Sequence, residues 1–171
     1  MKGLFSVKKN DKLISVFAPV NGMVIPETDI PDVAFSSGML GEGLGIVPKN
    51  GHFISPVKGT VIDVTSTGHA ISLKSDDGAE ILLHIGIDTV TLKGEGFSVK
   101  VKNGDKVEVG TPLVDVDLNF IKSKNLSDIC ALIIINHDEF SQLTVFEGEC
   151  EAGSSRIISF VSETGKAKIN Q

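Results

Sequence analysis

The sequence contains no tryptophan and no tyrosine, and it has only two cysteines among its 171 residues. Two cysteines, Cys130 and Cys150, are too few for a disulfide framework, which excludes a small secreted protein held together by disulfides. The core must therefore be built from Ile, Val, Leu and the nine Phe residues. A chain of this length suits one domain with a sizeable core.

Long apolar runs are also missing. No stretch reaches the roughly 18 consecutive apolar residues that a membrane-spanning helix needs. The N-terminus has no apolar segment followed by a cleavage site, so we expect no secretory signal and a cytoplasmic protein. The formal net charge of −6 argues against nucleic acid as a partner, because nucleic-acid binding needs a basic surface.

The sequence contains an internal duplication. The segment 17–25 (FAPVNGMVI) recurs as 54–62 (ISPVKGTVI), and 43–49 (GLGIVPK) is echoed by 68–74 (GHAISLK). Each copy places Pro and Gly around short β-branched runs, which is typical of strand–turn–strand units. Such a unit cannot bury a face alone, so we expect an all-β fold: an antiparallel β-sandwich or flattened barrel with a few short helical turns. The sequence shows no alternation of strands and helices, so we do not expect a parallel sheet.

Three further elements are predicted from local signals. A helical turn is expected within 30–41, with Pro31 at its first helical position and Gly38 at its end. The segment 99–110 alternates like an exposed hairpin. A short helix is expected over 117–124, capped by its first residue.

A pair of histidines lies in another predicted hairpin. The β-type runs 69–74 and 80–85 flank the turn-forming sequence Ser-Asp-Asp-Gly. If the two aspartates form the centre of the loop, His69 faces His84, and directly opposed residues on one face have Cβ atoms roughly 4.5–5.5 Å apart. A three-residue loop with a bulge would shift the register by one residue and break this pairing.

In this register the neighbours of the two histidines are apolar, namely Ile71, Leu73 and Leu82. Two neutral imidazoles in such a setting have few hydrogen-bond partners unless they serve a ligand, a metal or a reacting group. The alternative is a pair of partly buried core residues, and spacing alone does not separate the two interpretations.

This stretch resembles the phosphohistidine signature of the glucose-type enzyme IIA family, the phosphocarriers of the bacterial sugar phosphotransferase system. The matching segments are 78–90 (GAEILLHIGIDTV), 92–97 (LKGEGF), 67–70 (TGHA) with the family's second histidine, and 32–35 (DVAF) with 41–43 (GEG) as its N-terminal landmark. The resemblance implies the family's duplicated hybrid motif as the fold. It covers the chain from about residue 16 almost to the C-terminus.

Composition and resemblance together divide the chain into three parts. Residues 1–15 are basic and polar and are expected to form a flexible tail. Residues 16–162 are expected to form a single enzyme IIA type 1 domain. Residues 163–171 are polar and are expected to fray.

The resemblance implies a role for each residue of the site. His84 is the residue phosphorylated through Nε2, and His69 supports the phosphoryl group. A neutral imidazole is available as a nucleophile near pH 7, because its unperturbed pKa is about 6.5. The other ring nitrogen of the acceptor must donate a hydrogen bond that fixes tautomer and orientation. Thr67 lies two residues before His69 and can orient its ring.

The resemblance also implies partners: the phosphocarrier protein HPr as donor, and the cysteine of a sugar-specific enzyme IIB/IIC permease as acceptor. Asp32 and Asp88 are expected to pair with arginines of such a partner. Val33, Phe35 and Val90 are the candidates for an apolar docking surface. Regulatory targets would be further partners. Docking on the permease would bring the protein to the membrane surface, and the sequence does not fix the sugar.

Two other functions fit parts of the sequence. Lysostaphin-like zinc hydrolases share a related duplicated β fold, but their further histidine ligand corresponds to Leu82 here. Only His69 and His84 remain, whereas a catalytic zinc normally takes three protein ligands. We therefore expect no intrinsic metal and no tightly bound cofactor, with zinc conceivable only where a partner carboxylate completes the site. A lipoyl- or biotinyl-type module is suggested by 107–113 (VEVGTPL), but Lys58 is a poor attachment site.

Overall fold

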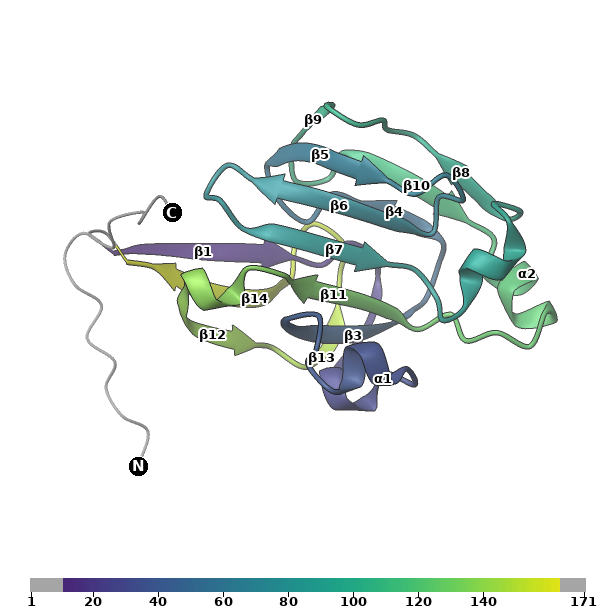
Figure 1. Ribbon diagram of the computed structural model, residues 1–171, viewed down its shortest axis with the longest axis horizontal. Coiled ribbons are helices and arrows are strands. Elements are labelled where there is room, and N and C mark those ends of the chain that lie inside the picture. The colour runs from purple at the N-terminus through teal and green to yellow at the C-terminus, as the bar shows by residue number, and fades with distance from the viewer. Residues whose placement is uncertain (1–10, 164–171) are drawn as a thin grey trace.

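The computed structural model of the protein describes residues 11–163, which are arranged as packed antiparallel β-sheets (Figure 1). Most of the predicted N-terminal tail and C-terminal segment lie outside the described residues. The tail was predicted too long, however, because strand β1 begins at Lys12 and pairs along its length with β14. Ile14 and Val16 alternate into the core at 2% and 0% exposure, which explains why these residues form a strand.

Residues 11–163 form fourteen strands and five short helical segments. The strands of the N-terminal half are β1 (Lys12–Phe17), β2 (Gly22–Pro26), β3 (Glu42–Pro48), β4 (His52–Ile54), β5 (Gly59–Val64), β6 (Ala70–Ser75) and β7 (Glu80–His84). The others are β8 (Phe97–Val99), β9 (Lys106–Val107), β10 (Pro112–Val116), β11 (Cys130–Ile134), β12 (Ser141–Val145), β13 (Gly148–Cys150) and β14 (Arg156–Ser162). The helices are α1 (Val33–Ser36) and α2 (Leu118–Ser123), with 3-10 turns η1 (Glu27–Asp29), η2 (Thr89–Leu92) and η3 (His137–Glu139). Within the described range, no helix is long and apolar enough to cross a membrane.

The strand order is symmetric about the centre of the large sheet. The eight-stranded sheet runs β13-β2-β3-β11-β7-β6-β5-β9, and two three-stranded sheets run β1-β14-β12 and β4-β10-β8. Read from its two ends, the large sheet matches β13 with β9, β2 with β5, β3 with β6 and β11 with β7. The duplication seen in the sequence thus extends to the whole fold, with the junction of the halves between β7 and β11, which run side by side in Figure 1.

The two Pro-containing segments of the repeat bind each other reciprocally. Phe17 N donates to Pro56 O at 3.0 Å, and Ile54 N donates to Pro19 O at 2.8 Å. Phe17 and Ile54 occupy the same position in the two copies, and so do Pro19 and Pro56. Paired bonds of this kind are what an approximate twofold relation between the halves produces.

The all-β, antiparallel class predicted from the sequence is confirmed, since every strand pair in the described residues is antiparallel. Of the two predicted architectures, the strand pairing supports the sandwich. Over residues 11–163 the large sheet ends at the short strands β13 and β9 and does not close on itself.

Strand β11 shows where the core lies, because all five of its residues are buried. Leu132 and Ile134 face the main core, whereas Ala131 and Ile133 belong to a second cluster with Phe35 and other apolar residues on the outer face. A strand covered on both faces requires a continuous apolar sequence. The second cluster therefore packs α1 against the outer face of the sheet beside β7.

The helix predicted within 30–41 forms, but it begins later than expected. Pro31 does not occupy its first turn, because Asp32 is the N-cap and its carboxylate accepts a hydrogen bond from Ala34 N at 2.9 Å. The helix ends before Gly38, which has a φ of 75°. The helix predicted over 117–124 is confirmed as α2, with Asp117 capping Phe120 N at 2.9 Å.

The hairpin predicted over 99–110 is wrong. A turn does form, since Asp105 N donates to Lys102 O at 3.1 Å. The strands on its two sides separate, however: β8 pairs with β10 and β9 pairs with β5. Each strand therefore pairs with a strand distant in sequence and not with the other side of its own turn.

Candidate functional site

The hairpin that carries the two histidines is β6–β7, and its register differs by one residue from the prediction. Ala70, and not His69, lies opposite His84, and Lys74 lies opposite Glu80. Successive side chains of a strand point to opposite faces, so this shift changes every predicted neighbour across the hairpin, but not those on the same strand.

The turn explains the shift. Ser75 N donates to Ala79 O at 2.9 Å, which leaves three residues in the loop and not two. Gly78, the last of them, has a φ of 93°, the left-handed conformation that a three-residue hairpin loop needs at this point. The composition Ser-Asp-Asp-Gly suits either loop, so the register could not be read from it.

The neighbours of His84 are consequently not those expected. Ile71 and Leu73 are 0% exposed and belong to the main core. His84 shares the outer face with Leu82, as predicted, and lies opposite Ala131 on the other neighbouring strand. The surroundings of His84 are apolar, but they come from β11 and α1 and only in part from the hairpin.

His69 reaches His84 despite the shifted register. The centroids of the two imidazole rings are 5.1 Å apart and the ring planes meet at 79°. His69 immediately precedes β6, next to Gly68 with its φ of 74°, and still bonds the neighbouring strand because Ile85 N donates to His69 O at 2.7 Å. The strict alternation of side chains holds only inside the strand, which leaves His69 free to turn toward the face of His84.

The ring of His84 is held on two sides. Its Nδ1 lies 2.8 Å from Gly86 O, and a carbonyl oxygen can only accept, so Nδ1 carries a proton. In the neutral ring Nε2 is then the unprotonated, nucleophilic nitrogen. The ring of Phe35 packs on the imidazole with a centroid distance of 5.0 Å.

The ring of His69 is held by hydroxyl groups. Thr67 Oγ1 lies 2.6 Å from His69 Nδ1, and Thr65 Oγ1 lies 3.4 Å from the same atom. Thr67 thus makes the contact that its spacing suggested. A hydroxyl that donates to Nδ1 leaves the ring proton on Nε2, where it can serve as a donor.

Burial keeps both imidazoles neutral. Desolvation lowers the pKa of His84 below its ordinary value, and the Gly86 carbonyl, Asp32 and Asp88 partly oppose this pKa shift. Desolvation also lowers the pKa of His69, and the neighbouring His84 lowers it further. At neutral pH the pair therefore offers one nucleophilic nitrogen and one neutral donor.

The residues expected at a docking surface divide into two groups. Val33 and Val90 are exposed by 74% and 53%. Phe35 is only 4% exposed and packs its ring against His84, so it lies at the site as expected, while its part in docking a partner stays a prediction. Asp32 and Asp88 lie close enough to His84 to influence its pKa.

Two residues beneath the site were not recognisable from the sequence. The hydroxyl of Thr89 is buried and donates to Ile85 O at 2.6 Å. Cys130, which is also buried, lies close enough to the Gly86 amide for that amide to partly oppose the rise that burial causes in the pKa of its thiol. Neither spacing nor composition indicates these contacts, because they depend on how the turn after β7 packs on β11.

The histidine pair brings two potential metal ligands together. Among residues 11–163, no group of three or more His, Cys, Asp or Glu side chains is placed to hold a metal ion. The zinc hydrolase considered from the sequence would need such a group. Lys58, the attachment candidate of a swinging-arm module, lies 4.0 Å from Glu108 in an exposed ion pair.

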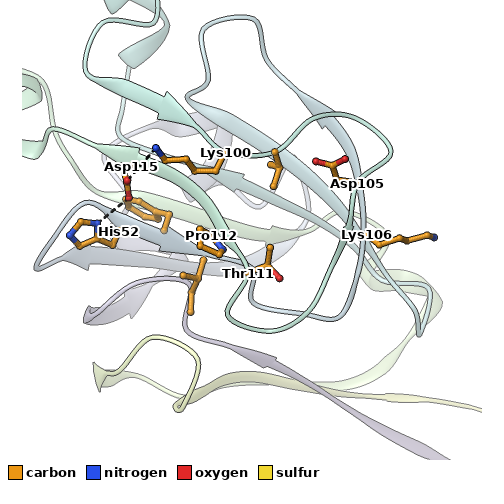
Figure 2. Close-up of a pocket in the computed structure, with 10 residues that line it drawn as sticks. His52, Lys100, Asp105, Lys106, Thr111, Pro112 and Asp115 are labelled. Atoms are coloured by element: carbon orange, nitrogen blue, oxygen red, sulfur yellow. Dashed lines mark hydrogen bonds and ion pairs between the residues drawn. The ribbon is translucent and has the colours of Figure 1, made fainter.

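A surface groove of about 690 Å³ lies elsewhere, beside β4 and β10. Figure 2 shows His52 and Lys100 on either side of Asp115 at one end of it, and Asp105 and Lys106 at the other. Asp115 is engaged by both neighbours, with His52 Nδ1 at 3.0 Å and Lys100 Nζ at 3.7 Å. Neither histidine of the pair lines this groove.

Fold and site together define a class of protein: a duplicated β-sandwich with adjacent histidines, one of which presents an unprotonated Nε2. Residues 14–140 match the family of the phosphoenolpyruvate-dependent sugar phosphotransferase system, EIIA 1. The chain therefore belongs to this family, as the resemblance implied, and is a phosphotransferase component that carries a phosphoryl group.

Individual relatives agree with this assignment. The chain is 43% identical over 148 residues to the glucose-specific EIIA component of the PTS system of Halalkalibacterium halodurans, covering 84% of each chain. It is 42% identical over 163 residues to the component of the same name from Oceanobacillus iheyensis, covering 94% of this chain and 99% of the relative. The solved glucose permease IIA from Mycoplasma capricolum matches with a TM-score of 0.82 and 36% identity, over 86% of this chain and 96% of that one.

Proposed function

We propose that His84 Nε2 accepts a phosphoryl group from the phosphohistidine of HPr and passes it to the cysteine of a sugar-specific enzyme IIB domain. The observation that carries the proposal is the hydrogen bond of 2.8 Å from His84 Nδ1 to Gly86 O. It leaves Nε2 as the only ring nitrogen with a free lone pair.

Phosphoryl transfer leaves the protein little covalent work beyond alignment and charge stabilisation. The lone pair of Nε2 forms the new N–P bond as the N–P bond of the donor breaks, and the electron pair of that bond returns to the donor ring. The proton stays on Nδ1, and the partial positive charge of the phosphorylated ring strengthens its bond to Gly86 O. That bond therefore favours the phosphorylated state.

His69 is assigned the supporting role. With Thr67 at 2.6 Å from Nδ1, the Nε2–H of His69 can donate to a phosphoryl oxygen on the adjacent ring. Onward transfer requires charge on the departing phosphoryl group to be stabilised, and a fixed donor in an apolar site does this at low cost. His69 should matter more for giving the phosphoryl group away than for receiving it.

Glucose is the proposed sugar, because the relatives from Halalkalibacterium halodurans and Oceanobacillus iheyensis are named as glucose-specific components. The protein itself would not contact the sugar, but only the permease that carries it. It would act in the cytoplasm and meet the membrane by docking on the IIB/IIC permease. A zinc ion would require a ligand from a partner, since His69 and His84 supply two at most.

Labelled phosphoenolpyruvate with the general phosphotransferase proteins tests the assignment of roles. His84→Gln should incorporate no acid-labile phosphate. His69→Gln, which keeps a donor in reach, should still be labelled but should transfer onward to the IIB domain about 10²–10³-fold more slowly, the usual cost of losing one such electrostatic donor.

His52→Gln is the matched control, because His52 is an exposed histidine paired with Asp115 away from the site. It should be labelled and discharged at the wild-type rate. If His69→Gln loses the label while His84→Gln keeps it, the roles are reversed. If both variants keep the label, the histidine pair is not the site.

A further inference from the structure

The carbonyl that orients His84 belongs to a turn whose backbone is held by several hydrogen bonds. Gly86 O accepts from His84 Nδ1 at 2.8 Å. The amide on the other side of the same peptide, Ile87 N, donates to Ser127 O at 3.0 Å. The peptide plane between Gly86 and Ile87 is therefore anchored at both ends.

The preceding peptide is anchored as well. Its carbonyl, Ile85 O, accepts from the hydroxyl of Thr89 at 2.6 Å. The thiol of Cys130 lies near its amide, on Gly86, and burial raises the pKa of that thiol to about 12. The thiol thus stays protonated, and its own hydrogen is directed at Asp128 O at 3.4 Å.

Thr89 is the only one of these anchors that is a hydroxyl side chain within the turn, and it is 0% exposed. A Cβ on Gly86 would collide with its methyl group, so Thr89 packs directly under the residue whose carbonyl holds His84. A buried hydroxyl is costly unless it is bonded, and valine would fill the same space without that cost. The hydroxyl group is thus better explained by its bond to Ile85 O than by packing.

We infer that Thr89 is a positioning residue for phosphoryl transfer: its hydroxyl fixes the peptide before Gly86, and through it the carbonyl that sets the tautomer and orientation of His84. The inference rests on the proposed role of His84 as acceptor. Small displacements of a nucleophile reduce transfer rates sharply, because the reacting atoms must be in line and close together.

The test separates the hydroxyl from the methyl group of Thr89. Thr89→Val keeps the shape and removes the hydroxyl, whereas Thr89→Ser keeps the hydroxyl and leaves a small cavity. Thr91→Val is the matched control, because the Thr91 hydroxyl also donates to a backbone carbonyl of this turn, Asp88 O at 2.7 Å, but does not touch the peptides around Gly86.

The first readout is nitrogen NMR of the histidine rings in the unphosphorylated protein. We expect wild type, Thr89→Ser and Thr91→Val to show His84 protonated on Nδ1 and unprotonated on Nε2. Thr89→Val should show a mixture of the two tautomers. The second readout is the rate of His84 phosphorylation by HPr, which should fall about ten- to hundredfold in Thr89→Val and recover in Thr89→Ser, although Thr89→Ser should be the less stable of the two.

A Thr89→Val protein with the wild-type tautomer and rate would overturn the inference. So would a loss of rate in Thr89→Ser equal to that in Thr89→Val, because packing alone would then explain both. Should Thr89→Val fail to fold, normal ring signals in a destabilised Thr89→Ser would support the inference, and disordered ring signals there would overturn it. If wild type takes no label on His84, the proposed function fails, while the NMR result still decides whether Thr89 sets the tautomer.

Discussion

At the scale of single residues, the site depends on a histidine that is kept neutral. His84 donates one hydrogen bond, from its Nδ1 to Gly86 O, and its ring also packs beside those of Phe35 and His69. Desolvation dominates and lowers its pKa, despite the carboxylates of Asp32 and Asp88. A neutral ring is a better nucleophile, and the cost of keeping it neutral falls on stability at low pH.

The direction of that cost can be worked out. Because the folded pKa of His84 lies below its ordinary value, the unfolded chain binds more protons between the two values, and stability rises with pH across that window. The contribution of His84 to stability is complete above about pH 6.5, the pKa of histidine in the unfolded chain. It is lost as the pH falls toward the pKa of His84 in the folded protein. Denaturant unfolding of wild type and His84→Gln between about pH 5 and pH 7.5 should show it.

The difference in unfolding free energy between the two proteins should favour wild type less and less as the pH drops below about 6.5. It should be constant above that pH. A difference that stays the same over the whole range would contradict a lowered pKa for His84.

The sequence alone found the histidine pair and Thr67, because a long local motif carries them. The sequence did not decide whether Phe35 is buried, since apolar character does not tell a docking residue from a buried one. Thr89 was not singled out, because a hydroxyl group becomes informative only when its burial is known.

At the scale of elements, helix α1 is only four residues long, and two contacts explain why it persists. Asp32 caps its first turn through Ala34 N, and Phe35 buries its ring against Ile133 and the rest of the outer cluster. A four-residue helix has little stability of its own, so tertiary packing must hold it.

Phe35→Ala should therefore be strongly destabilising. Removing a buried aromatic ring typically costs about 3–5 kcal/mol, and the loss here would also remove the ring that packs on His84. Denaturant unfolding measures the first effect, and the rate of labelling by HPr should fall as well. Val33→Ala, on the exposed side of the same helix, should change stability by no more than about 0.5 kcal/mol. Equal stability of the two variants would mean that Phe35 does not anchor α1.

Two hairpins were predicted incompletely from the sequence, and in both the difference arises at the turn. The β6–β7 pair was expected, but its three-residue loop moved the register by one residue. The turn near Asn103 and Gly104 was expected as well, yet the strands on its two sides belong to different sheets. Local composition indicates that a chain reverses its direction. It does not determine how many residues the loop contains or with which strand each flanking segment pairs.

At the scale of the whole molecule, the net charge is negative and two carboxylates lie near the site. The formal net charge is −6, and Asp32 and Asp88 are near enough to raise the pKa of His84. Charges at the rim of an interface act mainly on association rate and on its salt dependence. These two carboxylates would steer a basic donor toward the apolar surface that includes Val33 and Val90.

Asp32→Asn combined with Asp88→Asn should slow labelling of His84 by HPr roughly tenfold at low salt, and by much less at high salt, where screening already weakens the attraction. Asparagine keeps an oxygen that can cap α1, so the helix should survive the change. Stopped-flow labelling at several ionic strengths is the measurement.

Asp76→Asn with Glu108→Gln is the control for net charge, since it removes the same charge from exposed positions. Asp76 lies in the β6–β7 loop, and Glu108 directly follows β9. It should leave the low-salt rate close to that of wild type. Equal slowing by both pairs would attribute the effect to overall charge and would remove Asp32 and Asp88 from the interface.

The sequence by itself determined the all-β class, the duplication and the family. Each of these rests on local signals that add up along the chain: alternation, turn residues, a repeated Pro-Val-x-Gly unit and a long motif around His84. The reciprocal bonds between Phe17 and Pro56 and between Ile54 and Pro19 follow directly from that repeat.

Only the tertiary structure decided how the site is assembled. His69 contacts His84 although it lies just before strand β6 and is not paired with His84 in the sheet. Strand β11 and helix α1 supply the apolar surroundings. Thr89 and Ser127 fix the turn that holds the nucleophile. These contacts join segments that are distant in sequence, and their geometry depends on the length of one loop and on which face of a strand is covered. Local sequence preferences constrain neither, because burial is a property of the packed molecule.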